Sequence, residues 1–276
     1  MEWSKYSAII TEYDQILDHG KTFSSLLEVK TPAEEHESYG EQIFTKLLAH
    51  CVTLRLLSPD PDRKTPMQLW DLASVSAIAR SAIETYDAFA YIALGNVSPE
   101  EREFRILLWE LHDANRRAKM LEHIGSTDTR YFDIVAKDQR LLEQVLSHQA
   151  FPQITKSIQK KVHDRDPPAY YLTQRERCIA HGINFDYYTA ATMQLSQYVH
   201  TLPFSVHQLF SFKAGTNEAL HLMAMPLQYT LAFLCKCVVG IRVLFPAIQL
   251  RASQDIERKI SLWTTLVERG VKKNAA

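Results

Sequence analysis

Glycines in this chain fall where runs of helically spaced apolar residues stop, and this placement is the feature that most limits its fold. The glycines in question are Gly20, Gly95, Gly125, Gly182 and Gly270. A glycine just past a helix takes the left-handed backbone conformation that ends the helix at little steric cost. Start signals accompany them, because Ser98-Pro99-Glu100-Glu101 and Thr173-Gln174-Arg175-Glu176 have the form of helix N-caps with a glutamate three residues on.

The segments between these marks predict an all-α fold, a multi-helix bundle of about ten helices with long central ones. Alternating apolar and polar residues bounded by hairpin dipeptides, the usual sign of β-strands, do not occur. The expected helices are 3–18, 37–57, 67–94, 98–123, 128–147, 151–162, 174–181, 185–200, 204–212, 216–249 and 253–269.

A proline-rich, charged connector at 58–66 predicts the division of the chain. We expect residues 1–66 to form an N-terminal helical pair with this connector, and residues 67–276 to form the main helical bundle. A second such segment, 164–168, is more typical of a link between helices of one bundle.

Charge and cysteine content bear on the binding partners and the cellular location of the protein. The 31 basic residues nearly balance the 32 acidic ones, which argues against a dedicated binder of nucleic acid or anionic membrane. Four scattered cysteines and the lack of a leader segment favour a reduced, cytoplasmic, soluble protein. Cys235 and Cys237 point about 200° apart on a helix, so we expect two core cysteines rather than a metal clip.

The stretch 219–250 raises the question of a membrane span. Residues 219–235 carry no Asp, Glu, Lys or Arg, but His221, Pro226, Lys236 and Arg242 interrupt the apolar run before it reaches a bilayer's thickness. We therefore predict no membrane span and a central core helix, kinked at Pro226 and again near Pro246.

Two polar stripes on otherwise apolar helices give the main candidate site. Arg80 and Glu84 lie one turn apart on the helix expected at 67–94, and Ser196 and His200 lie one turn apart on the helix expected at 185–200. Buried charges need polar partners, so we expect the two stripes to face each other in a small buried polar site. A closed hydrogen-bond network that fixes helix register and a binding site for a ligand are both open interpretations.

The residues around these stripes resemble a known family. Ala79-Arg80-Ser81-Ala82-Ile83-Glu84, Tyr188 and Leu195-Ser196-Gln197-Tyr198-Val199-His200 resemble a bacterial all-helical domain-of-unknown-function family. Its members carry an Arg-Ser-x-x-Glu helix and a Leu-Ser-x-Tyr-Val-His helix. The resemblance covers about residues 65–250. It implies that Arg80, Glu84, Ser196 and His200 are marked positions, and it supplies no activity.

Arg175 and His181 fit the Arg-x(4–6)-His pattern of HEPN ribonucleases, which gives the chain a weaker resemblance to these metal-independent helical enzymes. In such an enzyme the arginine would steady the scissile phosphate, and His181 or His200 would move protons. The pattern is common by chance, since three further pairs match it: Arg105 with His112, and Arg116 and Arg117 with His123.

Other chemistry is not favoured by the sequence. Glu218 and His221 form one Glu-x-x-His element, but a di-iron bundle needs two, so we expect neither metal nor cofactor. Ser196 with His200 lacks the exposed turn of a hydrolase nucleophile. Tyr170 and Tyr171, beside Arg175, are more typical of packing anchors than of a base-stacking surface.

Three functions are compatible with the sequence. The first is a binding or sensing module in which Arg80, Glu84, Ser196 and His200 hold an anionic small molecule or nucleotide. The second is a HEPN-like ribonuclease, with RNA as a less favoured partner, and the third is a structural interaction protein with a closed polar network. The sequence is compatible with a homodimer in each case.

Overall fold

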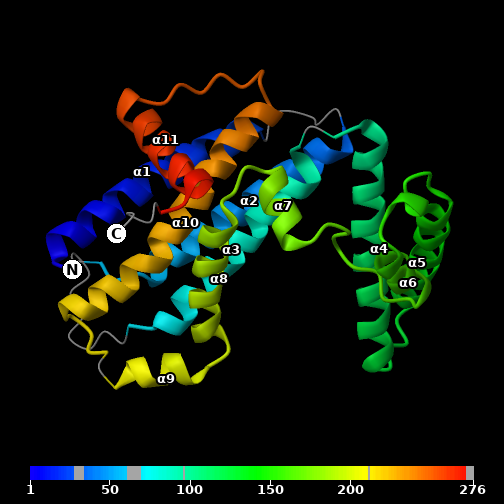
Figure 1. Ribbon diagram of the computed structural model, residues 1–276, viewed down its shortest axis with the longest axis horizontal. Coiled ribbons are helices and arrows are strands. Elements are labelled where there is room, and N and C mark those ends of the chain that lie inside the picture. The colour runs from blue at the N-terminus through cyan, green and yellow to red at the C-terminus, as the bar shows by residue number, and fades with distance from the viewer. Residues whose placement is uncertain (28–33, 61–69, 96, 211, 272–276) are drawn as a thin grey trace. The chain divides into compact units, whose positions relative to one another are not determined.

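The computed structural model describes residues 1–27, 34–60, 70–95, 97–210 and 212–271. These residues form eleven α-helices and one 3₁₀ turn, with no strand among them (Figure 1). The prediction of an all-α multi-helix fold is confirmed. The contacts divide the chain into two compact units, one of residues 1–94 with 178–276 and one of residues 95–177.

The first unit is built around two long helices, α3 and α10, that pack against each other. More than half of the residues of each helix are buried, 14 of 22 in α3 and 16 of 28 in α10. Around them pack α1, α2, α8 and α11, and α9 follows α8. The helices of this unit are α1 (Trp3–Leu27), α2 (Glu35–Leu57), α3 (Leu72–Ala93), α8 (Phe185–Val199), α9 (Pro203–Leu209), α10 (Asn217–Leu244) and α11 (Gln254–Arg269).

Helix α10 occupies the core position that its composition predicts. By length and composition it is the one helix in the described part of the chain that could cross a membrane, and 67% of its most apolar window is buried inside the protein. Cys235 and Cys237 are both buried and unbonded, as expected of core cysteines. Pro226 lies inside the helix. The helix ends at Leu244, before Pro246, so the expected extension to 249 is wrong.

Helix ends follow the glycine signals with one exception. Gly95, Gly125, Gly182 and Gly270 all have positive φ, as predicted for residues that end helices. Gly20 does not end a helix, because α1 continues through it to Leu27. A Cβ at Gly20 would lie 3.0 Å from a methyl carbon of Leu48 on α2, so this glycine permits close approach of two helices.

The division of the chain differs from the one expected at 66/67, which itself falls outside the described residues. Helices α1 and α2 do not form a separate pair, because they pack against α10 and α2 packs against α3. The C-terminal segment 178–276 returns to the same core. Local proline content marks a connector, but it carries no information about which distant segments share a core.

The second unit has its own apolar core. It contains α4 (Pro99–His123), α5 (Thr129–Ser147), a 3₁₀ turn (Phe151–Gln153) and α6 (Lys156–His163), and α7 (Gln174–Ala180) carries the chain across the boundary at 177/178. Helices α4 and α5 pack together. The buried residues between the elements are Phe104, Leu108, Leu111, Ala114, Leu141, Val145, Phe151 and Val162. The single helix expected at 151–162 is divided because Thr155 caps a new helix, α6.

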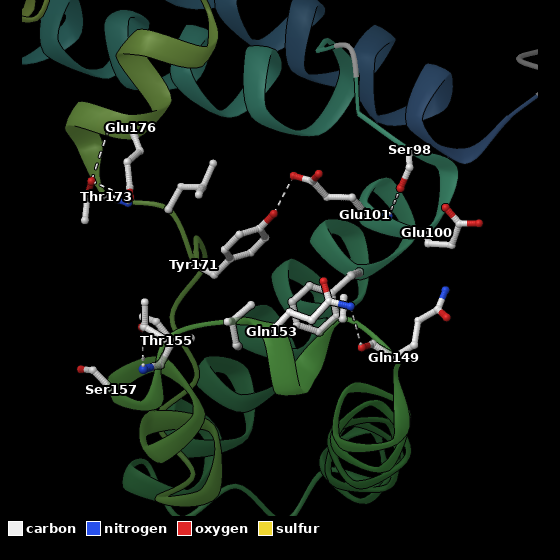
Figure 2. Close-up of a pocket in the computed structure, with 15 residues that line it drawn as sticks. Ser98, Glu100, Glu101, Gln149, Gln153, Thr155, Ser157, Tyr171, Thr173 and Glu176 are labelled. Carbon is white, nitrogen blue, oxygen red and sulfur yellow. Dashed lines mark hydrogen bonds between the residues drawn. The ribbon is translucent and has the colours of Figure 1, made fainter.

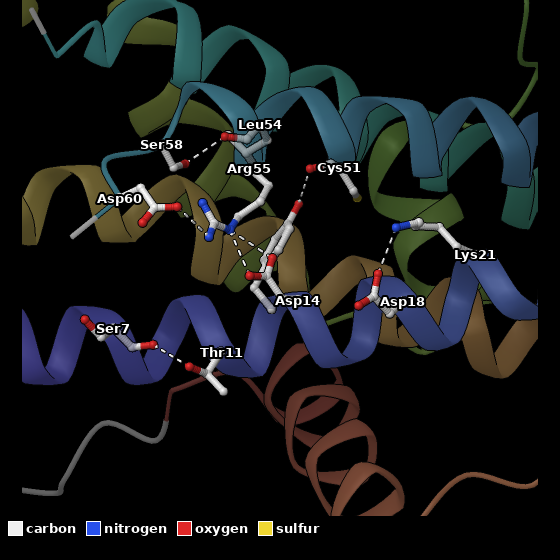
Figure 3. Close-up of polar contacts among 11 residues, drawn as sticks. Ser7, Thr11, Asp14, Asp18, Lys21, Cys51, Leu54, Arg55, Ser58 and Asp60 are labelled. Atoms are coloured by element: carbon white, nitrogen blue, oxygen red, sulfur yellow. Dashed lines mark hydrogen bonds and ion pairs between the residues drawn. The ribbon is translucent and has the colours of Figure 1, made fainter. Parts of the chain in front are cut away.

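Hydrogen-bonded ion pairs join α1 to the end of α2 in the first unit (Figure 3). Arg55 donates from Nε to both carboxylate oxygens of Asp14, at 2.8 and 3.0 Å, and from Nη2 to Asp60 at 3.1 Å. Nearby, the Tyr13 hydroxyl on α1 donates to the Cys51 carbonyl on α2 at 3.1 Å. These bonds fix the register of the two helices.

Replacing Asp14 by alanine should lower the free energy of unfolding by about 1–2 kcal/mol, because it removes two charge-assisted bonds to the mostly buried Arg55. Asp18→Ala is the matched control on the same helix. Its partner Lys21 and its own side chain are 52% and 69% exposed, so the loss should stay below about 0.5 kcal/mol. Urea denaturation measures both values, and equal losses would contradict the interpretation.

Candidate functional site

The structure brings three of the four residues of the predicted polar site together. Helices α3 and α8 pack against each other, and Arg80 on α3 donates from Nη1 to the Thr192 carbonyl on α8 at 2.8 Å. The same nitrogen donates to the Ser196 hydroxyl, which in turn donates to the Thr192 carbonyl at 2.8 Å. Arg80 Nε bonds Glu84 at 2.8 Å. We call Arg80, Glu84, Thr192 and Ser196 the Arg80 network.

His200 is not part of the Arg80 network. It is the C-cap of α8 and lies exposed, and its side chain makes no hydrogen bond or ion pair with any residue that the structure describes. The chain turns immediately after it, at Thr201 with φ of 51°. The expected partnership of His200 with Arg80 and Glu84 is absent among the described residues, because Arg80 contacts α8 at Thr192 and Ser196, one turn before its exposed end.

The Arg80 network is half-buried rather than enclosed. The side chains of Arg80 and Glu84 are 28% and 54% exposed, and Glu84 pairs with Arg80 on its own helix rather than with α8. Two of the three guanidinium nitrogens of Arg80 already have acceptors in Glu84, Thr192 or Ser196, and the second terminal nitrogen makes no bond to a described residue. The geometry is that of a clamp between two helices.

The residues of the ribonuclease pattern lie at the two ends of α7. Arg175 is exposed in the first turn, and His181 follows the last helical residue and is half-buried. Thr173 and Glu176 form the predicted capping box, because Thr173 N donates to Glu176 at 2.7 Å and Glu176 N donates to the Thr173 hydroxyl at 3.3 Å. Helix α7 therefore begins where the sequence predicted.

A cavity of about 760 Å³ lies in the second unit, and we call it the second-unit cavity (Figure 2). Three segments line it: the start of α4, the stretch 149–158 and the stretch 171–176. Its polar lining residues are Ser98, Glu100, Glu101, Gln149, Gln153, Thr155, Ser157, Thr173 and Glu176. Apolar side chains and two aromatic rings complete the wall: Phe104, Ala150, Ile154, Ile158, Tyr171 and Leu172.

Glu101 connects two of these segments. It accepts a hydrogen bond of 2.6 Å from the Tyr171 hydroxyl and bonds of 3.1 and 2.6 Å from Arg105, whose side chain is only 3% exposed. Burial alone would raise the pKa of Glu101, but the Tyr171 hydroxyl and the Arg105 guanidinium lower it. Burial and the neighbouring carboxylate raise the pKa of Tyr171 to about 12, so Tyr171 stays a donor and Glu101 stays ionised at neutral pH.

Helix caps provide much of the polar lining. Ser98 accepts from Glu101 N at 3.2 Å to begin α4, and Thr155 accepts from Ile158 N at 3.4 Å to begin α6. Both hydroxyls face the same cavity as the Thr173 cap of α7. The sequence predicted two of these caps as helix starts, but nothing in their local pattern indicated that they share one cavity.

Metal chemistry finds no support in the described part of the chain. No group of three or more His, Cys, Asp and Glu side chains there could hold an ion. Glu218 and His221, the one Glu-x-x-His element, lie near the start of α10.

Comparison of the chain with protein-family models, with curated proteins and with solved structures found no match. The function of this protein must therefore be inferred from the geometry of its own residues.

Arg80→Ala should lower the free energy of unfolding by about 1–3 kcal/mol, because it removes the charged bonds that tie α3 to α8. His200→Ala, at the exposed end of the same helix α8, should change it by less than about 0.5 kcal/mol. Urea denaturation of both variants checks this. A neutral Arg80→Ala variant would show that the clamp contributes nothing.

Proposed function

We propose that this chain is a small-molecule-binding module and that its ligand site is the second-unit cavity. The observation that carries the proposal is the cavity itself, whose volume of about 760 Å³ falls within the range of about 300–1,000 Å³ typical of ligand sites. Its wall combines an apolar floor with a limited set of polar groups. This combination is what ligand sites use to supply both affinity and orientation.

The wall of the second-unit cavity is held in place before any ligand arrives. Phe104 belongs to the core of the unit, and the Tyr171 ring packs 5.7 Å from it, centroid to centroid. The hydroxyl of Tyr171 is fixed by Glu101. A preformed wall reduces the entropy lost on binding, which supports binding as the function of this unit.

For the Arg80 network we propose a structural role in place of the expected one. An anion or nucleotide held by Arg80, Glu84, Ser196 and His200 would have to displace bonds that already join α3 and α8. Glu84 would also repel it. The network therefore supports the interpretation of a closed cluster, in which its bonds fix helix register.

The ribonuclease alternative stays a prediction with a direct assay. If Arg175 and His181 acted on RNA, the purified protein would degrade single-stranded RNA in EDTA, and His181→Ala would abolish the cleavage. We expect no such cleavage, since Arg175 is an exposed residue in the first turn of a capped helix. A reduced, cytoplasmic location and a homodimer are proposals that the sequence alone supports.

A thermal-shift screen tests the binding proposal. The panel holds sugars, nucleotides, organic anions and amines. A ligand present at ten times its Kd should stabilise the protein by about 1.4 kcal/mol, or roughly 3–5 °C. Ser157→Trp, which places a large ring in the second-unit cavity, should abolish the shift.

Ser147→Trp is the matched control, because Ser147 is an exposed serine of the same unit that does not line the cavity. This variant should keep the shift. A shift that Ser157→Trp leaves intact, or no shift with any compound, would refute the proposed site.

A further inference from the structure

We infer that the ligand of the second-unit cavity is an extended organic cation, an alkyl diamine or polyamine whose ammonium groups are held by Glu100 and Glu176. The inference rests on the proposed function and specifies its ligand chemistry. It is carried by the negative charge of the cavity lining, by the position of these two carboxylates on different sides of the cavity and by the apolar side chains that also line it.

The charge of the lining is one-sided. Glu100, Glu101 and Glu176 contribute three carboxylates, and the fifteen described residues that line the cavity include no Lys, Arg or His. Arg105 compensates Glu101 from behind the wall. Each helix start contributes about half an elementary positive charge. The full negative charges of Glu100 on α4 and Glu176 on α7 outweigh these partial charges. An anionic ligand is therefore disfavoured.

Two of the three carboxylates keep capacity for a ligand. Both bonds that Glu176 accepts from Thr173 go to Oε2, at 2.7 Å each, and its Oε1 accepts no bond from a described residue. Glu100 lies exposed in the first turn of α4. Hydrogen bonds from the backbone and from Ser98 lower the pKa of Glu100, and those from Thr173 lower the pKa of Glu176. Both groups are ionised at neutral pH.

The two carboxylates lie on opposite sides of the cavity with an aromatic ring between them. Figure 2 shows Glu176 on the side of α7, Glu100 on the side of α4, and Tyr171 in the middle. These acids do not gather into a cluster that could hold a metal ion, as far as the described residues show. Separated negative charges match a ligand with separated positive charges better than they match a point cation.

The surface between the carboxylates suits a hydrocarbon chain. Tyr171, Leu172 and Ile154 line the cavity, and Phe104 lies beneath them in the core. Methylene groups that leave water to contact these side chains favour binding, because apolar surface is buried on both sides.

Isothermal titration calorimetry of the full chain with spermidine tests the inference. Glu176→Gln and Glu100→Gln should each weaken binding about 5–10-fold, and the double variant about 30–100-fold. Glutamine keeps the capping box of α7 while it removes the charge, so the fold is preserved. Glu143→Gln, an exposed glutamate of α5 outside the cavity, is the matched control and should bind as the unaltered protein does.

Three further probes separate this inference from the proposed function: triethylene glycol as a neutral chain, AMP as an anion, and magnesium chloride. If spermidine binds, and if Ser157→Trp blocks this binding while Glu176→Gln and Glu100→Gln weaken it, the result supports both the proposed site and the cationic ligand. If triethylene glycol or AMP binds, spermidine does not, and Ser157→Trp blocks the binding, the inference of a cationic ligand is overturned and the proposed site is supported. Equal competition by magnesium, or equal weakening by Glu143→Gln, would indicate surface charge attraction and overturn the inference. If none of these probes binds, the inference of a polyamine ligand is overturned, and the thermal-shift panel decides the proposed function separately.

Discussion

The constraint on which the rest of this structure depends is that the first backbone N–H groups of a helix have no partner inside the helix. Ser98, Thr155 and Thr173 provide partners for three separate helices, and their hydroxyls face one cavity. A cap fixes where its helix begins and therefore where the next side chains point. In α7 the glutamate three residues on returns to its cap, whereas in α4 the equivalent Glu101 reaches Tyr171 and Arg105. The same requirement for a capping partner thus determines where the helix begins and places Glu101 where it can bond Tyr171 and Arg105 in the cavity wall.

Local signals predicted the elements of this fold well and their association poorly. Ser98 and Thr173 began helices, and Gly95, Gly125, Gly182 and Gly270 followed helix ends, because capping depends on neighbours within about four residues. Gly20 has the same local appearance, but its role is set by Leu48, twenty-eight residues away. The contacts divide the chain differently from the expected boundary for the same reason, since residues 178–276 belong to one unit with residues 1–94, although the whole second unit separates them in the sequence.

The two polar sites differ in how far periodicity could reveal them. Arg80 meets Ser196 because each lies on a regular helix, where a spacing of four residues defines a face. His200 shares that spacing, and its N–H still bonds the Ser196 carbonyl, but it lies at the exposed end of α8, beyond the residues that Arg80 contacts. The second-unit cavity combines helix starts, a 3₁₀ turn and a connecting stretch without regular secondary structure. None of these has a repeat, and the sequence around Tyr171 favoured a packing anchor over a binding surface.

The two sites differ in whether their polar groups already have hydrogen-bond partners within the protein. In the Arg80 network the cation, the carboxylate and the hydroxyl bond to one another, so their free energy goes into joining α3 to α8. In the second-unit cavity the backbone N–H groups are capped, yet Glu176 Oε1 and the exposed Glu100 remain beside an apolar floor. A ligand gains polar affinity from groups that are not already bonded within the protein, and for this reason the proposed binding site is placed in the second unit rather than at the Arg80 network. The polar bonds of the first unit serve its stability instead.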